Sequence, residues 1–71
     1  MTSIVTHLKI AKKLKAVRIA KQLTQLELSE KAGISANYYA KVERGEATPS
    51  LDTFAKIVKA LGVKSSDILP F

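Results

Sequence analysis

The chain has 71 residues, of which 46% are hydrophobic and 25% charged, and its formal net charge is +6. This length and composition predict one small globular domain, residues 1–71, with its core over about residues 7–69, and exclude a disordered chain. The absence of cysteine excludes disulfides and thiolate metal sites and fits a cytoplasmic location.

Neither a membrane protein nor an enzyme is expected. The apolar runs are only a few residues long, and the N-terminus MTSIVTHLKIAKK does not resemble a signal peptide. The only histidine, His7, has no carboxylate close in sequence and is predicted to be a surface residue. Because glycine-rich phosphate loops and grouped carboxylates are also missing, we expect no catalytic site, no cofactor and no metal.

The positive charge is concentrated in the first half of the sequence. Residues 1–34 hold seven basic and two acidic side chains, whereas residues 35–71 hold five basic and four acidic ones. A pI near 9.9 favours a polyanionic partner, although a run of lysines can also be a solvated helix face.

Five short helices are predicted, and the first runs from about His7 to Lys21. One face of this helix is apolar, with residues spaced i, i+4 and i+7: Ile10, Leu14 and Val17. Thr24 caps the second helix, and Glu27 completes a T-x-x-E capping box. The second helix ends at Gly33, which can adopt a positive φ.

The remaining three helices follow from similar signals. Ser35 caps the third helix, which ends near Arg44–Gly45, and Ser50 caps the fourth, which stops at Gly62. The face of the fourth helix that is expected to be buried comprises Leu51, Phe54, Ile57, Val58 and Leu61. A last turn over Ser65 to Leu69 adds Ile68 and Leu69 to the core. The predicted fold class is therefore all-α, a compact bundle of five short helices.

The segment from Thr24 to Glu43 has the pattern of a helix-turn-helix. Small Ser29 lets two short helices cross closely, and the apolar positions are in register to bury between them: Leu28, Ala32, Ile34, Tyr39 and Val42. In such a motif the second helix can lie in the major groove of DNA. Its outer face then has no core to cover.

From about Ile10 to Leu69, the sequence resembles the phage-repressor and Cro type of helix-turn-helix domain, which has the lambda-repressor-like fold. The shared motifs are Leu14 to Arg18, Leu23-Thr24-Gln25, Lys31 to Ser35, Val42 to Gly45, Thr48 to Leu51 and Ala60 to Val63. The resemblance implies sequence-specific binding of double-stranded DNA at a palindromic operator, as a dimer that represses or activates transcription. The small size is similar to that of stand-alone restriction-modification controller proteins.

The resemblance implies that several residues contact the DNA backbone. Gln25 places its side chain and its backbone N–H against a phosphate at the start of the second helix. Thr24 and Ser35 are caps first, and any phosphate contact is a second role. Glu46 would repel phosphate, so the following loop must hold the backbone through Thr48, Ser50 and the first N–H groups of the fourth helix.

The third helix is expected to read the bases. Its exposed face comprises Ala36, Asn37, Tyr38, Lys41 and Arg44. Asn37 can pair with an adenine edge and Lys41 with guanine, whereas Ala36 offers only a methyl group. Tyr38 is expected to contact a phosphate or sugar rather than to pack. The side chain of Tyr39 should enter the core, with its hydroxyl at the domain edge.

Three residues are predicted to be structural. Gly33 forms the turn, and the resemblance implies that Arg18 pairs with Glu43, which ties the first helix to the third. Arg18 could also lie near a phosphate. Two separate surface charges are the alternative interpretation of this pair.

A homodimer is expected through the fourth and fifth helices, where Ile68, Leu69 and Phe71 are available. One alternative function is an antitoxin that binds a toxin protein and its own operator. Another is a helix-turn-helix used only for protein interaction, which the basic charge disfavours. The chain could be a stand-alone regulator or an excised domain of a longer repressor, and the sequence fixes neither the operator nor the sign of regulation.

Overall fold

The computed structural model of the protein describes residues 2–69, with side chains from residue 8 onward. The secondary structure of these residues comprises α1 (Thr2–Ala20), α2 (Gln25–Ala32), α3 (Ala36–Glu43), α4 (Leu51–Leu61) and the 3-10 turn η1 (Ser65–Asp67). The predicted all-α class is confirmed, with the difference that a 3-10 turn stands where a fifth helix was expected.

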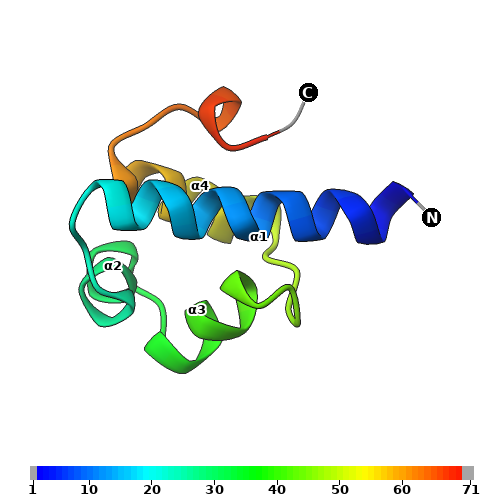
Figure 1. Cartoon of the computed structure of the whole chain (residues 1–71). Helices are drawn as coiled ribbons and strands as arrows, with labels where there is room; N and C mark the ends of the chain where they lie inside the picture. The colour runs from blue at the N-terminus through cyan, green and yellow to red at the C-terminus, as the bar shows by residue number, and fades with distance from the viewer. Residues whose placement is uncertain (1, 70–71) are drawn as a thin grey trace.

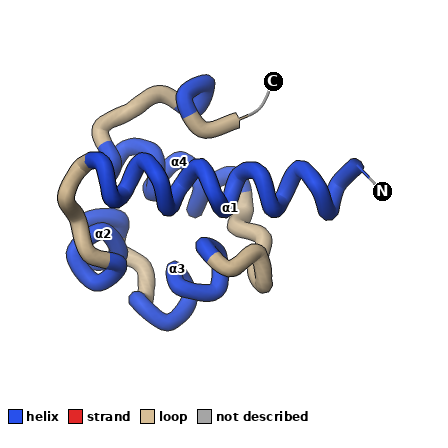
Figure 2. The backbone as a smooth tube through the Cα atoms, viewed as in Figure 1, coloured by secondary structure: helices blue, strands red, loops and turns tan. Residues whose placement is uncertain are grey.

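The long helix α1 is the central element of the fold. Figure 1 shows α2 and α3 on one side of α1 and η1 on the other, with α4 behind it. Short loops join the helices, as the tan segments of Figure 2 show. α2 packs against both α3 and α4, and α1 packs against α3. The helix α3 therefore has one covered face and one face at the edge of the molecule.

The core forms where the apolar stripes of the four helices meet. Its completely buried large side chains are contributed one by each helix: Leu14, Leu28, Tyr39 and Ile57. Ile68, just after η1, is also buried and belongs to the same cluster. Since every helix contributes, the position of α3 depends on all of the others.

The first helix begins earlier than predicted, at Thr2 instead of about His7. No glycine or proline precedes His7, so a helix nucleated further on can extend backwards, with one hydrogen bond gained for each residue. The side chain of His7 lies outside the described residues, and its placement on the surface remains a prediction.

An unexpected residue ends α1. Gln22 has a φ of 60°, in the left-handed region. Its N–H donates to the carbonyl of Ile19 at 2.9 Å, and the N–H of Leu23 donates to that of Arg18 at 3.1 Å. These two bonds form a Schellman motif, in which glycine usually occupies the left-handed position.

Leu51 was expected to be buried, and the structure shows this to be wrong, because 86% of its surface is exposed. It is the first residue of α4, and helical side chains point toward the N-terminus of their helix. The side chain of Leu51 therefore extends beyond the first turn of α4 and away from the core residue Phe54.

Two glycines that follow α2 and α3 adopt left-handed conformations. Gly33 has a φ of 73° and ends α2 as predicted, which turns the chain into α3. Gly45 has a φ of 75°, and a Cβ atom there would lie 2.9 Å from Cδ2 of Leu8. The N-terminal half of α1 therefore lies directly over the turn that follows α3.

Candidate nucleic-acid interface

The start of α2 presents backbone donors on the protein surface. The hydroxyl of Thr24 accepts from the N–H of Glu27 at 3.0 Å, and the Glu27 carboxylate accepts from the N–H of Thr24 at 2.8 Å. These bonds, first of all the one from the Thr24 backbone, hold the pKa of Glu27 below its ordinary value. Because this capping box satisfies two of the terminal N–H groups, those of Gln25 and Leu26 remain to face a ligand.

The side chain of Gln25 turns toward the protein. It is half-buried, and its Nε2 donates to Oε1 of Glu43 at 3.0 Å. The sequence predicts a contact between this side chain and a DNA phosphate, and it does not predict the hydrogen bond to Glu43. Gln25 can still donate its backbone N–H, and its amide has a second hydrogen, so a phosphate contact remains a prediction.

Arg18 and Glu43 form the predicted ion pair between α1 and α3. Nε of Arg18 donates to Oε2 of Glu43 at 2.6 Å, and its Nη2 donates to Oε1 at 3.1 Å. The third nitrogen, Nη1, donates to the carbonyl of Leu23 at 2.8 Å. The side chains are only 11% and 2% exposed, respectively. This fork therefore ties together α1, α3 and the chain entering α2.

The protonation of this pair follows from its surroundings. Burial by itself would raise the pKa of Glu43, but hydrogen bonds from Arg18 and from Gln25 outweigh it, and the pKa lies below its ordinary value. The hydrogen bond to Glu43 raises the pKa of Arg18. Both groups are therefore charged near neutral pH, which keeps the ion pair formed.

Tyr39 enters the core as predicted, but its hydroxyl does not reach the domain edge. The side chain is completely buried, and the hydroxyl lies beside the Glu43 carboxylate without a well-formed hydrogen bond. Burial, and then the neighbouring Glu43 carboxylate, raise the pKa of Tyr39 far above its ordinary value. The phenol is therefore neutral, and it completes the buried polar cluster at the end of α3.

The outer face of α3 carries the polar side chains predicted for base reading. Asn37, Lys41 and Arg44 are all exposed, and their spacing of three and four residues puts them in one row. The hydroxyl of Ser35 accepts from the N–H of Tyr38 at 3.0 Å, which caps the helix as predicted. This row therefore stands on a helix that is fixed at its start by Ser35 and at its end by Glu43.

Two other residues predicted on this face are less accessible. Ala36 is half-buried. Tyr38 is also half-buried and packs against the core cluster, although it was expected to point outward instead of packing. It lies one residue before the completely buried Tyr39, beside the buried face of α3.

Arg44 already has a partner. Its Nε and Nη2 donate to the Glu46 carboxylate at 2.9 and 3.1 Å, and both side chains are more than half exposed. This hydrogen bonding raises the pKa of Arg44 and lowers that of Glu46. Such an exposed pair is weak. Arg44 can therefore exchange Glu46 for another acceptor at little cost.

The loop before α4 contributes the last predicted residues. Ser50 caps α4, since its hydroxyl accepts from the N–H of Thr53 at 3.1 Å, and it also donates to the Thr53 hydroxyl at 3.0 Å. Thr48 is exposed. The Ser50 hydroxyl is thus engaged within the protein, and a phosphate contact from it would be a secondary role.

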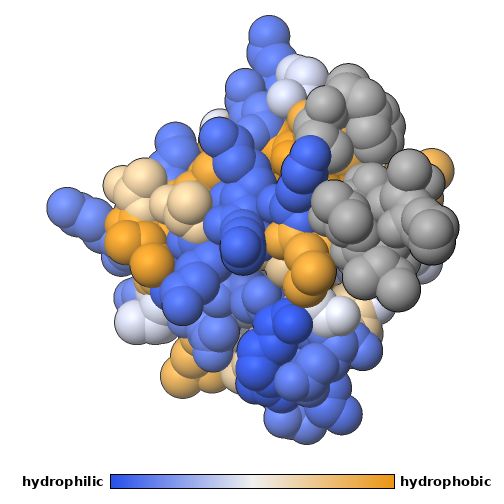
Figure 3. All heavy atoms as spheres, turned by 45° about the vertical axis from the view of Figure 1, so that its right-hand side comes forward, coloured by the Kyte–Doolittle hydropathy of each residue, from blue (hydrophilic) through white to orange (hydrophobic). Residues whose placement is uncertain are grey.

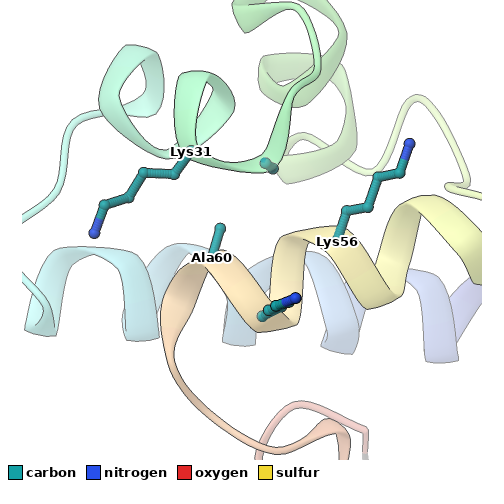
Figure 4. Close-up of a pocket in the computed structure, with 5 residues that line it drawn as sticks. Lys31, Lys56 and Ala60 are labelled. Atoms are coloured by element: carbon teal, nitrogen blue, oxygen red, sulfur yellow. The ribbon is translucent and has the colours of Figure 1, made fainter.

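A shallow groove lies between α2 and α4, away from this row. It has a volume of about 410 Å³ and is lined by Lys31, Ala32, Lys56, Lys59 and Ala60. Figure 4 shows the ammonium groups of Lys31 and Lys56 extending in opposite directions, with Ala60 between them. Because these two groups diverge, they do not form a clamp for a small anion.

Within residues 2–69, no group of three or more histidine, cysteine or acidic side chains could hold a metal ion. No helix in the same range combines the length and apolar character needed to cross a membrane. The candidate binding surface of this protein is therefore the pair α2 and α3, with backbone donors at the start of α2 and a polar row on α3.

Comparison with known proteins identifies this arrangement. A helix-turn-helix family model matches residues 14–68. The immunity repressor protein of Bacillus phage phi105 is 40% identical over 60 residues, which cover 84% of this chain and 42% of the repressor. The chain thus spans less than half the length of that relative.

Two restriction-modification proteins are similar over most of their length. The control protein C.BamHI of Bacillus amyloliquefaciens is 35% identical over 66 residues, or 92% of this chain and 82% of that protein. The crystal structure of the restriction-modification controller protein C.AhdI from Aeromonas hydrophila matches with a TM-score of 0.87 and 28% identity, covering 97% of this chain and 100% of that one. The chain therefore belongs to the Cro/C1-type helix-turn-helix family, whose members are DNA-binding transcriptional regulators and not enzymes.

Proposed function

We propose that the protein binds a specific sequence of double-stranded DNA through α3 and regulates transcription from that site. The observation that carries this proposal is the exposed row of Asn37, Lys41 and Arg44 on a helix anchored by the buried pair of Arg18 and Glu43. A rigid polar helix face of this kind can enter the major groove and present amide and ammonium donors to base edges.

The proposed contacts fall into two groups. Asn37 and Lys41 read bases, with Ala36 contacting a thymine methyl group at most. The backbone N–H groups at the start of α2, together with Thr24, Gln25, Ser35, Tyr38, Thr48 and Ser50, position the phosphates. Arg44 leaves Glu46 when DNA binds. Because phosphate contacts carry no sequence information, specificity depends on the first group.

We further propose that the protein acts as a homodimer on a palindromic operator. One domain has few base-reading residues, and engaging two half-sites together raises the affinity. We propose that the two copies meet through α4 and η1. Ile68 cannot take part in this interface, because it fills the core of its own subunit and is only 3% exposed. Leu51 and the half-buried Leu69 are the available side chains, whereas Phe71 lies outside the described residues.

No large apolar patch is evident on the face shown in Figure 3, where hydrophilic side chains separate the orange groups. The proposed interface through α4 and η1 offers only a few apolar side chains. Weak association of the free protein that is strengthened by DNA is the expected behaviour.

The named relatives support a regulator of the repressor or controller kind. A phage immunity repressor and two restriction-modification control proteins are similar to this chain. We propose that the whole chain, residues 1–71, acts as one helix-turn-helix domain in the cytoplasm. Within residues 2–69, no feature specifically favours the antitoxin alternative.

Selection of bound duplexes from a random pool tests this function. We expect enrichment of one motif with two-fold symmetry, whose half-sites are about one helical turn apart. Sedimentation of the protein on the selected duplex should show two copies for each operator. Recovery of unrelated duplexes after repeated rounds would contradict sequence-specific binding, and one copy on the full motif would contradict the dimer.

A further inference from the structure

The helix-turn-helix does not carry the positive charge of this protein, and neither do the loop and the start of α4 that follow it. Residues 24–52 contain three basic side chains, Lys31, Lys41 and Arg44, and five acidic ones, for a net charge of −2. Phosphate contacts from basic side chains supply most of the sequence-independent affinity for DNA. The proposed recognition surface therefore needs a source of positive charge from outside the motif.

Helix α1 is the most basic element of the described structure. It contains no acidic residue, and its four lysines are all exposed: Lys9, Lys12, Lys13 and Lys15. None of the four forms an ion pair within the part of the chain that the structure describes. Their charges are therefore not neutralised by the protein itself.

Only one side of α1 lies next to α3. Residues 8, 12, 15 and 19 form one stripe along the helix, because they are spaced by three and four positions. At one end of this stripe, Leu8 lies over Gly45, directly after α3. Arg18, which flanks the stripe at its other end, reaches Glu43 at the end of α3. Lys12 and Lys15 lie between these two contacts.

This placement puts Lys12 and Lys15 beside the C-terminal end of the recognition helix, where Arg44 is exposed. In Figure 1 the middle of α1 passes over that end of α3. A recognition helix contacts bases mainly through its N-terminal residues, so its C-terminal end leaves the groove next to a phosphate strand. The two lysines are on the side of α1 that such a strand would approach.

We propose that Lys12 and Lys15 of α1 extend the DNA interface beyond the helix-turn-helix by contacting the phosphate backbone that flanks the major groove. The partner is duplex DNA, so this inference rests on the function proposed above. The two contacts are sequence-independent and compensate for the net negative charge of residues 24–52.

The same helix offers a matched control. Lys9 and Lys13 are exposed but are turned away from the stripe that meets α3. Replacing either pair by glutamine removes the same charge from the same helix, and glutamine has nearly the helix propensity of lysine. Both double variants should therefore keep the fold, as circular dichroism can verify.

The test measures DNA affinity against salt concentration for the wild type, K12Q/K15Q and K9Q/K13Q, on the selected duplex and on a random one. Each phosphate contact contributes about 0.9 to the slope of log K against log salt. We expect K12Q/K15Q to reduce this slope by about 1 to 2 and the affinity at 0.1 M salt by at least about tenfold, equally on both duplexes. Because screening weakens distant charges, K9Q/K13Q should lower the affinity less than about threefold.

Equal losses in the two double variants would overturn the proposal, since they would indicate only an effect of net charge. Unchanged binding by K12Q/K15Q would overturn it as well. A wild-type protein that binds neither duplex would contradict the DNA-binding function itself, which distinguishes that failure from a wrong placement of the interface.

Discussion

A single buried carboxylate joins three helices of this protein. Glu43, at the end of α3, accepts from Arg18 on α1 and from Gln25 on α2. Charged groups taken out of water are costly unless they are paired and hydrogen-bonded, and here both carboxylate oxygens have donors. The value of such a cluster lies in fixing the orientation of α3.

Glu43→Ala should destabilise the fold by about 3 kcal/mol, because it leaves the largely buried guanidinium of Arg18 without its acceptor. DNA binding should weaken as well, although the loss of a negative charge alone would strengthen it. A double-mutant cycle of Arg18 and Glu43 in chemical denaturation measures the coupling, which should exceed the value of about 1 kcal/mol that limits exposed pairs. Coupling near zero, combined with tighter DNA binding, would make Glu43 an ordinary surface acid.

The pair also predicts a pH dependence. The folded-state pKa of Glu43 lies below its ordinary value of 4.5, so its contribution to stability is complete above pH 4.5 and is lost as the pH falls through the folded-state pKa. The difference in unfolding free energy between the wild type and Glu43→Gln should therefore shrink as the pH is lowered from about 5 to about 3. A difference that stays constant over this range would show that the carboxylate is not stabilised in the folded state.

Asn37→Ala separates base reading from backbone contact. It should cost about 1–3 kcal/mol on the preferred duplex and leave the affinity for random DNA almost unchanged. K12Q/K15Q is the comparison, because loss of phosphate contacts should weaken binding to both duplexes alike. Equal losses for Asn37→Ala on the two duplexes would show that α3 does not read sequence through this residue.

At the level of elements, the sequence predicted those helix ends that depend on residues close together in the chain. The caps Thr24, Ser35 and Ser50 all accept the expected backbone N–H, because a cap depends on a side chain and a backbone only a few residues apart. The start of α1 was missed, because nothing in the local sequence stops that helix. The prediction that Leu51 is buried was also wrong, because the spacing of apolar residues along a helix does not show where the neighbouring elements end.

The end of α1 offers a stabilising substitution. Gln22 holds a left-handed φ of 60°, which costs a residue with a side chain about 1–2 kcal/mol. Gln22→Gly should therefore raise the unfolding free energy by about 0.5–1 kcal/mol, since glycine removes this strain but gains flexibility in the unfolded state. Ala16→Gly, at an exposed position inside the same helix, serves as control and should lower stability. A lower melting temperature for Gln22→Gly would mean that its left-handed conformation carries no strain.

At the scale of the whole molecule, the features that the sequence did not reveal are contacts between residues far apart in the chain, which depend on tertiary packing. The resemblance predicted the pair of Arg18 and Glu43, but the third partner, Gln25, is 18 residues away from Glu43 and had a plausible role elsewhere. The sequence predicts Ile68 both in the core and at a dimer interface; its place in the core is confirmed, and this burial leaves it unavailable to a second copy. Periodicity identifies an apolar face without showing whether the same chain or another copy covers it.

The central claim is that one rigid face of α3 gives the protein its preference for a DNA sequence. The most direct measurement is the ratio of its affinities for the selected duplex and for a scrambled duplex of equal length, both titrated at about 0.15 M salt. Specific regulators bind their sites at least about 1,000-fold more tightly than random DNA, and we predict a ratio of this size for the wild type. A ratio near one would contradict the account, since it would leave only the attraction of a basic protein for phosphate.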